Sequence, residues 1–87
     1  MFQQITVDTS TVKSLDMTIP GHSYNTAVIS VEDADIRLRL DGQDPTTTIG
    51  VKIPKDSVIR LTDRNELKNA RFLCASGTAI LNVQFRA

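Results

Sequence analysis

Apolar and polar residues alternate along much of this chain with the period of two that is typical of half-buried β-strands. The alternation is clearest in two segments, 36–40 and 79–85, where an apolar residue occupies every second position. The matching patterns predict two strands that face each other across a core. In this prediction one set of apolar side chains packs against the other: Ile36, Leu38 and Leu40 against Leu81, Val83 and Phe85.

Six further segments show strand patterns between turn-forming residues. They are Gln4–Val7, Ser14–Ile19, Asn25–Val31, Ile49–Ile53, Ser57–Leu61 and Arg71–Ala75. We expect Ser14–Ile19 to be an edge strand, and the pattern leaves open which face of Ser57–Leu61 points inward. The acidic run 32–35 and the pair Lys55-Asp56 are predicted to form hairpin turns.

One short helix is expected, over Asp63–Asn69. Asp63 is a good N-cap residue, and Glu66 follows three positions later, as in a capping box. A helix this short needs tertiary packing to persist, and Leu67 is the apolar residue placed to provide it.

Composition favours sheet over helix, because Val, Ile and Thr together supply 25 residues against six Ala and two Glu. The many short strands and frequent turn residues predict an all-β fold, either an antiparallel β-sandwich or a small jelly-roll-like barrel. No linker or low-complexity tract divides the 87 residues, so residues 1–87 are expected to form a single domain.

The segment after the 36–40 strand has the residues of a structured turn. Asp41 tolerates left-handed backbone angles, and Gly42 adopts positive φ at little cost. Pro45 fixes its own φ and favours an extended conformation at the preceding residue. The hydroxyl of Thr46 can accept hydrogen bonds within the turn. We therefore predict that Asp41, Gly42, Pro45 and Thr46 form a structural turn.

Charge and cysteine content narrow the classes of function. The formal net charge is zero, which gives no electrostatic attraction to nucleic acid or to anionic lipid. No apolar run reaches membrane-spanning length, and the first residues, Met1-Phe2-Gln3-Gln4, do not have the pattern of a signal peptide. Cys74, the one cysteine, cannot form an internal disulfide and is expected in the core.

Candidate catalytic and metal-binding residues are sparse. His22 and Ser23 lie in a Pro-Gly loop without a second histidine or a nucleophile-elbow motif. Asp41 and Asp44 lack the spacing of a calcium-binding loop. We therefore expect no catalytic site, no metal and no cofactor. Arg37 and Arg39 share one face of their strand, and this face is expected to be either an interface or a solvated surface with cross-strand charge pairs.

The segment from about Val28 to Phe85 resembles a known class of protein. Its motifs are Ile36-Arg37, Asp41-Gly42-x-x-Pro45-Thr46, Gly50 and the closing Gly77-Thr78-Ala79-x-Leu81-x-Val83-x-Phe85. They are similar to those of the small β-rich structural proteins encoded with the head genes of tailed bacteriophages. The chain departs from that pattern at Leu38 and Phe85, where tyrosine is frequent, and at 53–56, where a more glycine-rich turn is usual.

The resemblance implies a non-catalytic virion component, made in the host cytoplasm. The leading expectation is a capsid decoration or cement protein that forms a homo-oligomer and binds the major capsid protein or another virion protein. A head–tail junction component remains an alternative. The 36–46 segment is also similar to a turn in β-sandwich modules appended to glycoside hydrolases, so a binding module for carbohydrate or a host receptor is a second alternative.

Overall fold

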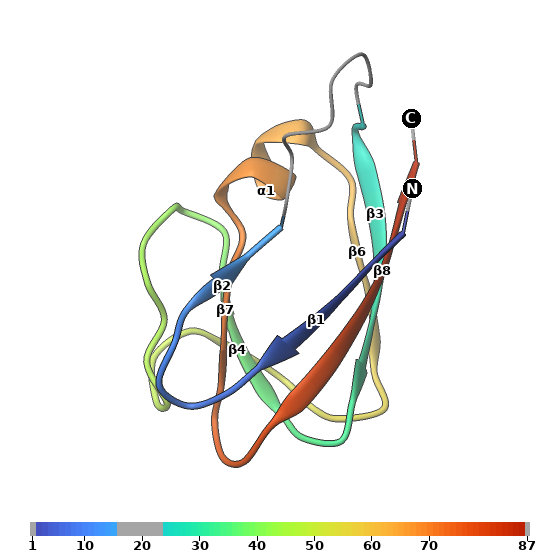
Figure 1. Cartoon of the computed structure of the whole chain (residues 1–87). Coiled ribbons are helices and arrows are strands. Elements are labelled where there is room, and N and C mark those ends of the chain that lie inside the picture. Colours follow the sequence, from blue (N-terminus) through green and yellow to red (C-terminus); the bar gives the residue numbers. More distant parts are fainter. Residues whose placement is uncertain (1, 16–23, 87) are drawn as a thin grey trace.

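The computed structural model describes residues 2–15 and 24–86, which form a β-sandwich of two four-stranded antiparallel sheets (Figure 1). Sheet A has the strand order β1-β8-β3-β6, and sheet B has the order β2-β7-β4-β5. The elements are β1 (Phe2–Val7), β2 (Lys13–Ser14), β3 (Thr26–Glu32), β4 (Ile36–Arg39), β5 (Val51–Ile53), β6 (Val58–Leu61), α1 (Arg64–Asn69), β7 (Arg71–Cys74) and β8 (Ala79–Arg86). The predicted all-β sandwich is confirmed.

The chain winds as one long hairpin that is rolled into two sheets. Strand β4 pairs with β5, β3 with β6, β2 with β7 and β1 with β8. This nested pairing of eight strands is the topology of a jelly roll. The two sheets stay separate among the described strands, so the sandwich form, rather than a closed barrel, is the one observed.

The core lies between the two sheets and is formed by the inward-facing side chains of the strands. Sheet A contributes Ile29, Val31, Leu81 and Val83, and sheet B contributes Ile36, Phe72 and Cys74, all of them fully buried. The ambiguous strand β6 faces inward with Leu61 and Ile59 and outward with Val58 and Arg60. No charged side chain is buried among the described residues.

Helix α1 closes the upper end of the sandwich and matches the sequence expectation. The Asp63 carboxylate accepts a hydrogen bond from the Asn65 amide at 2.9 Å, which caps the helix. Glu66 reaches back to the Thr62 amide at 3.2 Å, one residue earlier than in the standard capping box. Leu67 is fully buried and anchors the helix in the core.

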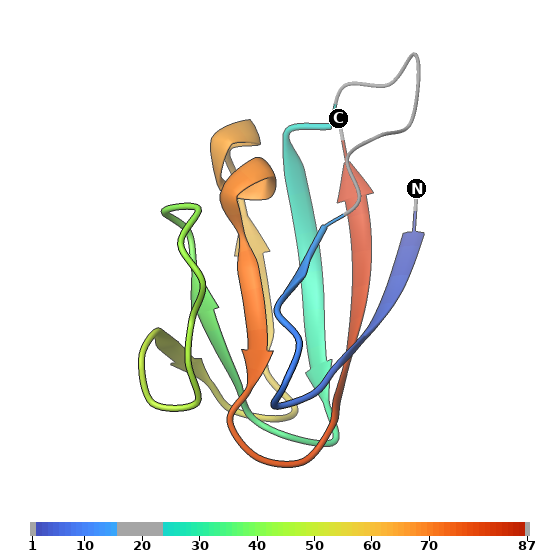
Figure 2. The same ribbon diagram turned by 60° about the vertical axis from the view of Figure 1, so that its left-hand side comes forward.

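Two predicted connections are wrong, because consecutive strands lie in different sheets. The runs 32–35 and Lys55-Asp56 were expected to form hairpins. Instead, β3 and β4 belong to sheets A and B, and β5 and β6 belong to sheets B and A. Both connections therefore cross the end of the sandwich, at the lower end in Figures 1 and 2. Local alternation marks a strand but does not say which sheet receives it.

Two predicted strand ends also differ. Leu40 was expected in the core, but β4 ends at Arg39 and the Leu40 side chain is 37% exposed. Strand β5 begins at Val51, so Ile49 lies in the loop rather than in a strand. Of the predicted Ser14–Ile19 edge strand, Ser14 belongs to β2 and Leu15 is buried, whereas 16–19 lie outside the described residues, as do His22 and Ser23.

The difference between Leu81 and Leu40 gives a test of the core. Leu81→Ala removes a fully buried side chain and is expected to lower the free energy of unfolding by about 2–5 kcal/mol. Leu40→Ala, the matched control at an exposed position, should cost no more than about 0.5 kcal/mol. Urea unfolding followed by circular dichroism measures both, and equal costs would contradict the assignment of Leu81 to the core.

Candidate functional site

The β4–β5 loop, residues 40–50, is the candidate functional site because it combines a rigid backbone with exposed apolar side chains. It joins neighbouring strands of one sheet, whereas most connections cross between the sheets. Its first turn follows the predicted chemistry: Gly42 has φ 79°, and the Asp41 carboxylate accepts a hydrogen bond from the Gln43 amide at 3.2 Å. A side-chain acceptor of this kind stabilises a turn without help from neighbouring strands.

The second half of the loop is organised by Thr46 and Pro45. The Thr46 hydroxyl accepts hydrogen bonds from the amides of Thr48 and Ile49, at 3.3 and 2.9 Å. The Thr46 amide donates to the Ile49 carbonyl at 3.0 Å, which closes the turn. Pro45 is buried beneath it. The residues predicted to form the structural turn thus lie in one loop, and each has a defined part in its geometry.

Gly50 returns the chain to β5 and was not predicted to be conformationally special. Its φ of 129° lies in a region that other residues avoid. A Cβ atom at this position would lie 3.2 Å from the Leu38 carbonyl oxygen and 3.3 Å from the Cβ atoms of Arg37 and Pro45. The loop backbone therefore packs closely against β4, and any side chain at this position would force its neighbours to shift.

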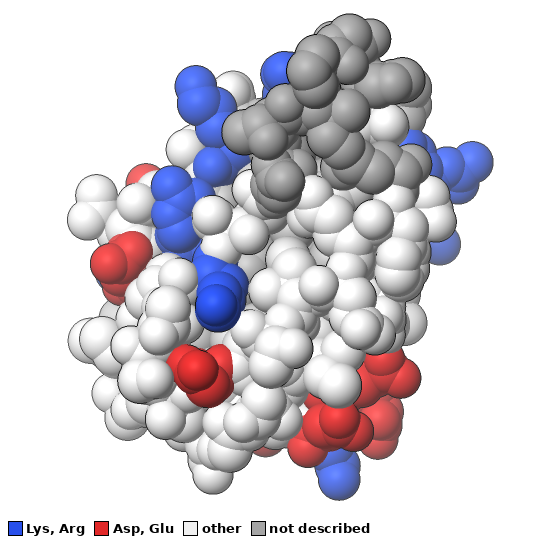
Figure 3. All heavy atoms as spheres, viewed as in Figure 1, with Lys and Arg blue, Asp and Glu red and all other residues white. Residues whose placement is uncertain are grey.

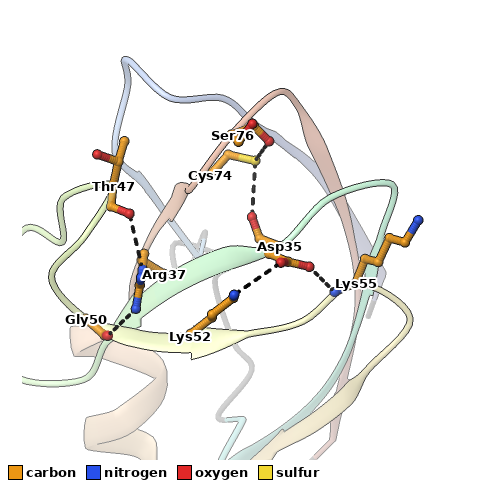
Figure 4. A network of polar contacts seen from close by, with 8 residues as sticks. All are labelled: Asp35, Arg37, Thr47, Gly50, Lys52, Lys55, Cys74 and Ser76. Carbon is orange, nitrogen blue, oxygen red and sulfur yellow. Dashed lines mark hydrogen bonds and ion pairs between the residues drawn. The ribbon is translucent and has the colours of Figure 1, made fainter.

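Arg37 fastens the loop to the sheet. Its Nε donates to the Thr47 carbonyl and its Nη1 to the Gly50 carbonyl, both at 3.3 Å (Figure 4). The side chain is half-buried, and its guanidinium group serves two loop carbonyls. Sequence analysis assigned Arg37 to an interface or a solvated face, and neither alternative included this contact with the loop.

Arg39 is also engaged within the loop. Its Nε donates to Asp41 Oδ1 at 3.0 Å, and its Nη2 bonds the other carboxylate oxygen, so the pair is bidentate. This hydrogen bond from Arg39 is the largest cause that lowers the pKa of Asp41, and the Gln43 amide adds to it. Both groups remain solvent-exposed. The pair therefore fixes the start of the loop and places two opposite charges at the surface next to it.

The loop and the adjoining strand ends expose a group of apolar side chains, here called the β4–β5 patch: Leu40, Ile49 and Val51. Ile49 is 56% exposed and Val51 is 61% exposed. The three line one open depression, with buried Leu38 beneath and the Arg39–Asp41 pair beside them. Exposed apolar groups gathered on a rigid loop are typical of protein-binding surfaces. Sequence analysis missed the patch because it placed Leu40 and Ile49 in strands, whereas of the three residues only Val51 lies in one.

A second polar cluster links the connections at the lower end of the sandwich, and its role is structural. The Asp35 carboxylate accepts from the Lys55 amide at 2.8 Å and lies 3.7 Å from the Lys52 ammonium group. The Asp35 carbonyl accepts from the Ala75 amide and lies 3.3 Å from Cys74 Sγ (Figure 4). These bonds join three crossing connections. Within residues 2–15 and 24–86, no three His, Cys, Asp or Glu side chains are grouped so as to hold a metal ion.

The close approach at Gly50 generates a stability prediction. Gly50→Ala should destabilise the protein by at least about 1 kcal/mol more than Gly77→Ala, for two reasons: φ 129° at Gly50 lies further from the left-handed region than φ 76° at Gly77, and only the Gly50 Cβ meets neighbouring atoms. At Gly77 a Cβ meets nothing within 4 Å, so that variant measures the cost of a side chain at positive φ without a steric contact. Equal losses in thermal or urea unfolding would contradict both the strained backbone at Gly50 and its close approach to β4.

The Arg39–Asp41 pair generates a pH prediction. Because the folded-state pKa of Asp41 is lowered, the stabilisation from the ionised carboxylate is present above the unfolded-state pKa of about 3.9 and is lost as pH falls through the folded value. The stability difference between the wild type and Asp41→Asn should therefore shrink on acidification. Arg39→Gln should weaken this pH dependence, since Arg39 is its main cause. A difference that is constant from neutral pH to below pH 3 would contradict the pairing.

No protein-family model, curated protein or solved structure matches this chain. None of the described helices is long and apolar enough to cross a membrane. The site's own geometry is therefore what bears on function. It consists of a rigid loop that displays a small apolar surface beside an ion pair.

Proposed function

We propose that this chain is a bacteriophage virion structural protein that decorates or cements the capsid, acting by self-association and by binding the major capsid protein or another virion protein. The observation that carries the proposal is the β4–β5 patch. Three apolar side chains are held on a backbone that Arg37, Thr46 and Gly50 fix in place. A preorganised surface loses little conformational entropy on binding, which favours association.

The fold supports the same role without being specific to it. Jelly rolls occur in viral capsid and lectin domains, and a fold by itself does not determine function. The motifs that resemble phage head proteins, Asp41-Gly42-x-x-Pro45-Thr46 and Gly50, fall in the loop that carries the patch. The resemblance and the exposed surface therefore point to the same part of the molecule.

The aromatic residues give less support to the carbohydrate-binding alternative. Sugar sites commonly use an exposed aromatic ring as a stacking platform. Tyr24 instead packs against Phe85, with ring centroids 5.6 Å apart, and Phe72 and Phe85 are buried. Phe2 is 58% exposed but lies on β1, away from the β4–β5 patch (Figure 2). The described aromatic rings thus serve mainly to pack the core.

Binding to shells tests the proposal. The purified protein is expected to sediment with capsid shells assembled from the major capsid protein of the same genome. Ile49→Asp places a charge in the patch and should weaken this binding about tenfold or more, because a buried unpaired charge is costly at an interface. Val58→Asp is the matched control: Val58 is 63% exposed but lies on sheet A.

Two outcomes would contradict different parts of the proposal. A wild-type protein that does not bind shells would refute the decoration role. If the wild type binds but Ile49→Asp and Val58→Asp behave alike, the patch is not the contact surface. Urea unfolding of both variants checks that neither result arises from loss of the fold.

A further inference from the structure

Strand β1 is an outer edge of sheet A. It pairs with β8 along all six of its residues, from Phe2 opposite Gln84 to Val7 opposite Ala79. No strand within residues 2–15 and 24–86 pairs with its other side, and Figure 2 shows β1 along the border of the sandwich. In an edge strand of an antiparallel sheet, every second residue directs its backbone N–H and C=O away from the sheet. Those groups can hydrogen-bond to another strand.

The four edge strands among the described residues differ in how well they are protected. Strand β2 has two residues; β5 has three, with Lys52 in the middle and Pro54 directly after it; β6 has four and contains Arg60. Short length, charge and proline are the usual devices that prevent edge pairing. Strand β1 is the longest of these edges, and its sequence, FQQITV, has neither a charged residue nor a proline. The surface along β1 is correspondingly free of charge in Figure 3.

We propose that β1 pairs antiparallel with β1 of a second copy, so that two sheets A join into one continuous eight-stranded sheet. Residues directly opposite each other in a sheet lie on the same face. The two-fold axis that relates the copies, perpendicular to the sheet, must therefore pass where one residue lies opposite its own copy. An axis between two consecutive residues would pair residues from opposite faces. With the axis at Gln4, Phe2 lies opposite Thr6 on the outer face and Gln3 opposite Ile5 on the inner face.

A side-chain ladder selects this partner and this register. Gln4 Nε2 donates to Asn82 Oδ1 at 3.0 Å, and the Asn82 amide donates to the Glu32 carboxylate. The ladder crosses β1, β8 and β3 on the outer face and ends at the sheet border with Gln4. A carboxamide has two N–H donors and an acceptor oxygen, and the bond to Asn82 uses one donor. Two Gln4 side chains across the axis can then donate to each other, which continues the ladder from one copy to the next.

Charge is also compatible with a second copy. The strand itself is uncharged, so two copies do not repel at the contact. The two Glu32 carboxylates would lie about five strand spacings apart, roughly 24 Å, which exceeds the screening length at physiological salt. Pairing of six-residue edges buries little surface compared with a permanent dimer, so the dimer is expected to depend on concentration.

This dimer would supply the self-association that the proposed function includes, but it does not depend on capsid binding, because it forms in solution without another protein. Strand β1 and the β4–β5 hairpin lie at opposite borders of the sandwich (Figure 2). Both copies therefore keep the β4–β5 patch accessible. If the patch binds shells, the dimer would contact two sites at once and bind more tightly than a monomer by avidity.

A charge-swap experiment tests the pairing. Gln4→Lys and Gln4→Glu each place like charges on opposite sides of the axis, and each is expected to raise the dissociation constant of the dimer about tenfold. Mixing the two variants should restore the dimer, because the opposed charges now attract. Gln84→Lys, on the same sheet face but one strand inward, is the matched control and should dimerise like the wild type. Sedimentation over a range of protein concentrations measures the wild type, the two Gln4 variants, their mixture and the Gln84→Lys control.

Hydrogen exchange provides a second measurement on the unmodified protein. The amides on the outer edge of β1 should become more protected as concentration rises and the dimer forms. A wild type that stays monomeric at all concentrations overturns the proposal, as does a dimer that neither Gln4 variant weakens or that mixing does not restore. Protection of β1 that arises only on capsid shells would identify a different partner strand and would also overturn it.

Discussion

The β4–β5 loop, residues 40–50, is the constraint on which the rest of this jelly roll depends. Outward from this loop, β3 pairs with β6, β2 with β7 and β1 with β8, so each pairing encloses the one before it. Strands β4 and β5 are closer in sequence than any other pair of hydrogen-bonded strands among the described residues, and closing their loop reduces the chain entropy that remains to be lost in the pairings beyond it. The hydrogen bonds of Thr46 and the contact at Gly50 hold this loop in one conformation. A register error here would move every outer pair.

The same loop explains why Arg37 has a role different from that of an ordinary surface arginine. Two carbonyl groups of the loop, those of Thr47 and Gly50, accept hydrogen bonds from the Arg37 side chain. A guanidinium group offers several N–H donors in a fixed plane and can serve both at once. Arg39 likewise pairs with Asp41. The positive charges of this face therefore hold the loop that displays the β4–β5 patch, so the contacts that stabilise the loop also fix the shape of the patch.

At its lower end in Figure 1, the sandwich has to carry the chain repeatedly from one sheet to the other. Asp35 joins three of these crossings through its carboxylate and its carbonyl. The Asp8 carbonyl, in the β1–β2 connection, accepts a hydrogen bond from the Cys74 amide and so links the fourth crossing to the other three. Cys74 is buried and contributes to this junction as well as to the core. The end of the sandwich is thus fixed by the Asp35 carboxylate together with backbone acceptors, and sequence patterns do not reveal the latter.

Sequence by itself determined the β class, most of the strands, the cap and anchor of α1 and the burial of Leu81, Val83 and Phe85. These features follow from local alternation and local capping, which each segment carries within itself. The turn at Asp41, Gly42 and Thr46 was predictable for the same reason. Tertiary structure decided which strands share a sheet, because alternation is identical for a hairpin and for a crossing. It also decided that Leu40 and Ile49 lie outside the core and that Arg37 binds loop carbonyls, since these outcomes depend on where β4 ends and on groups ten or more residues away.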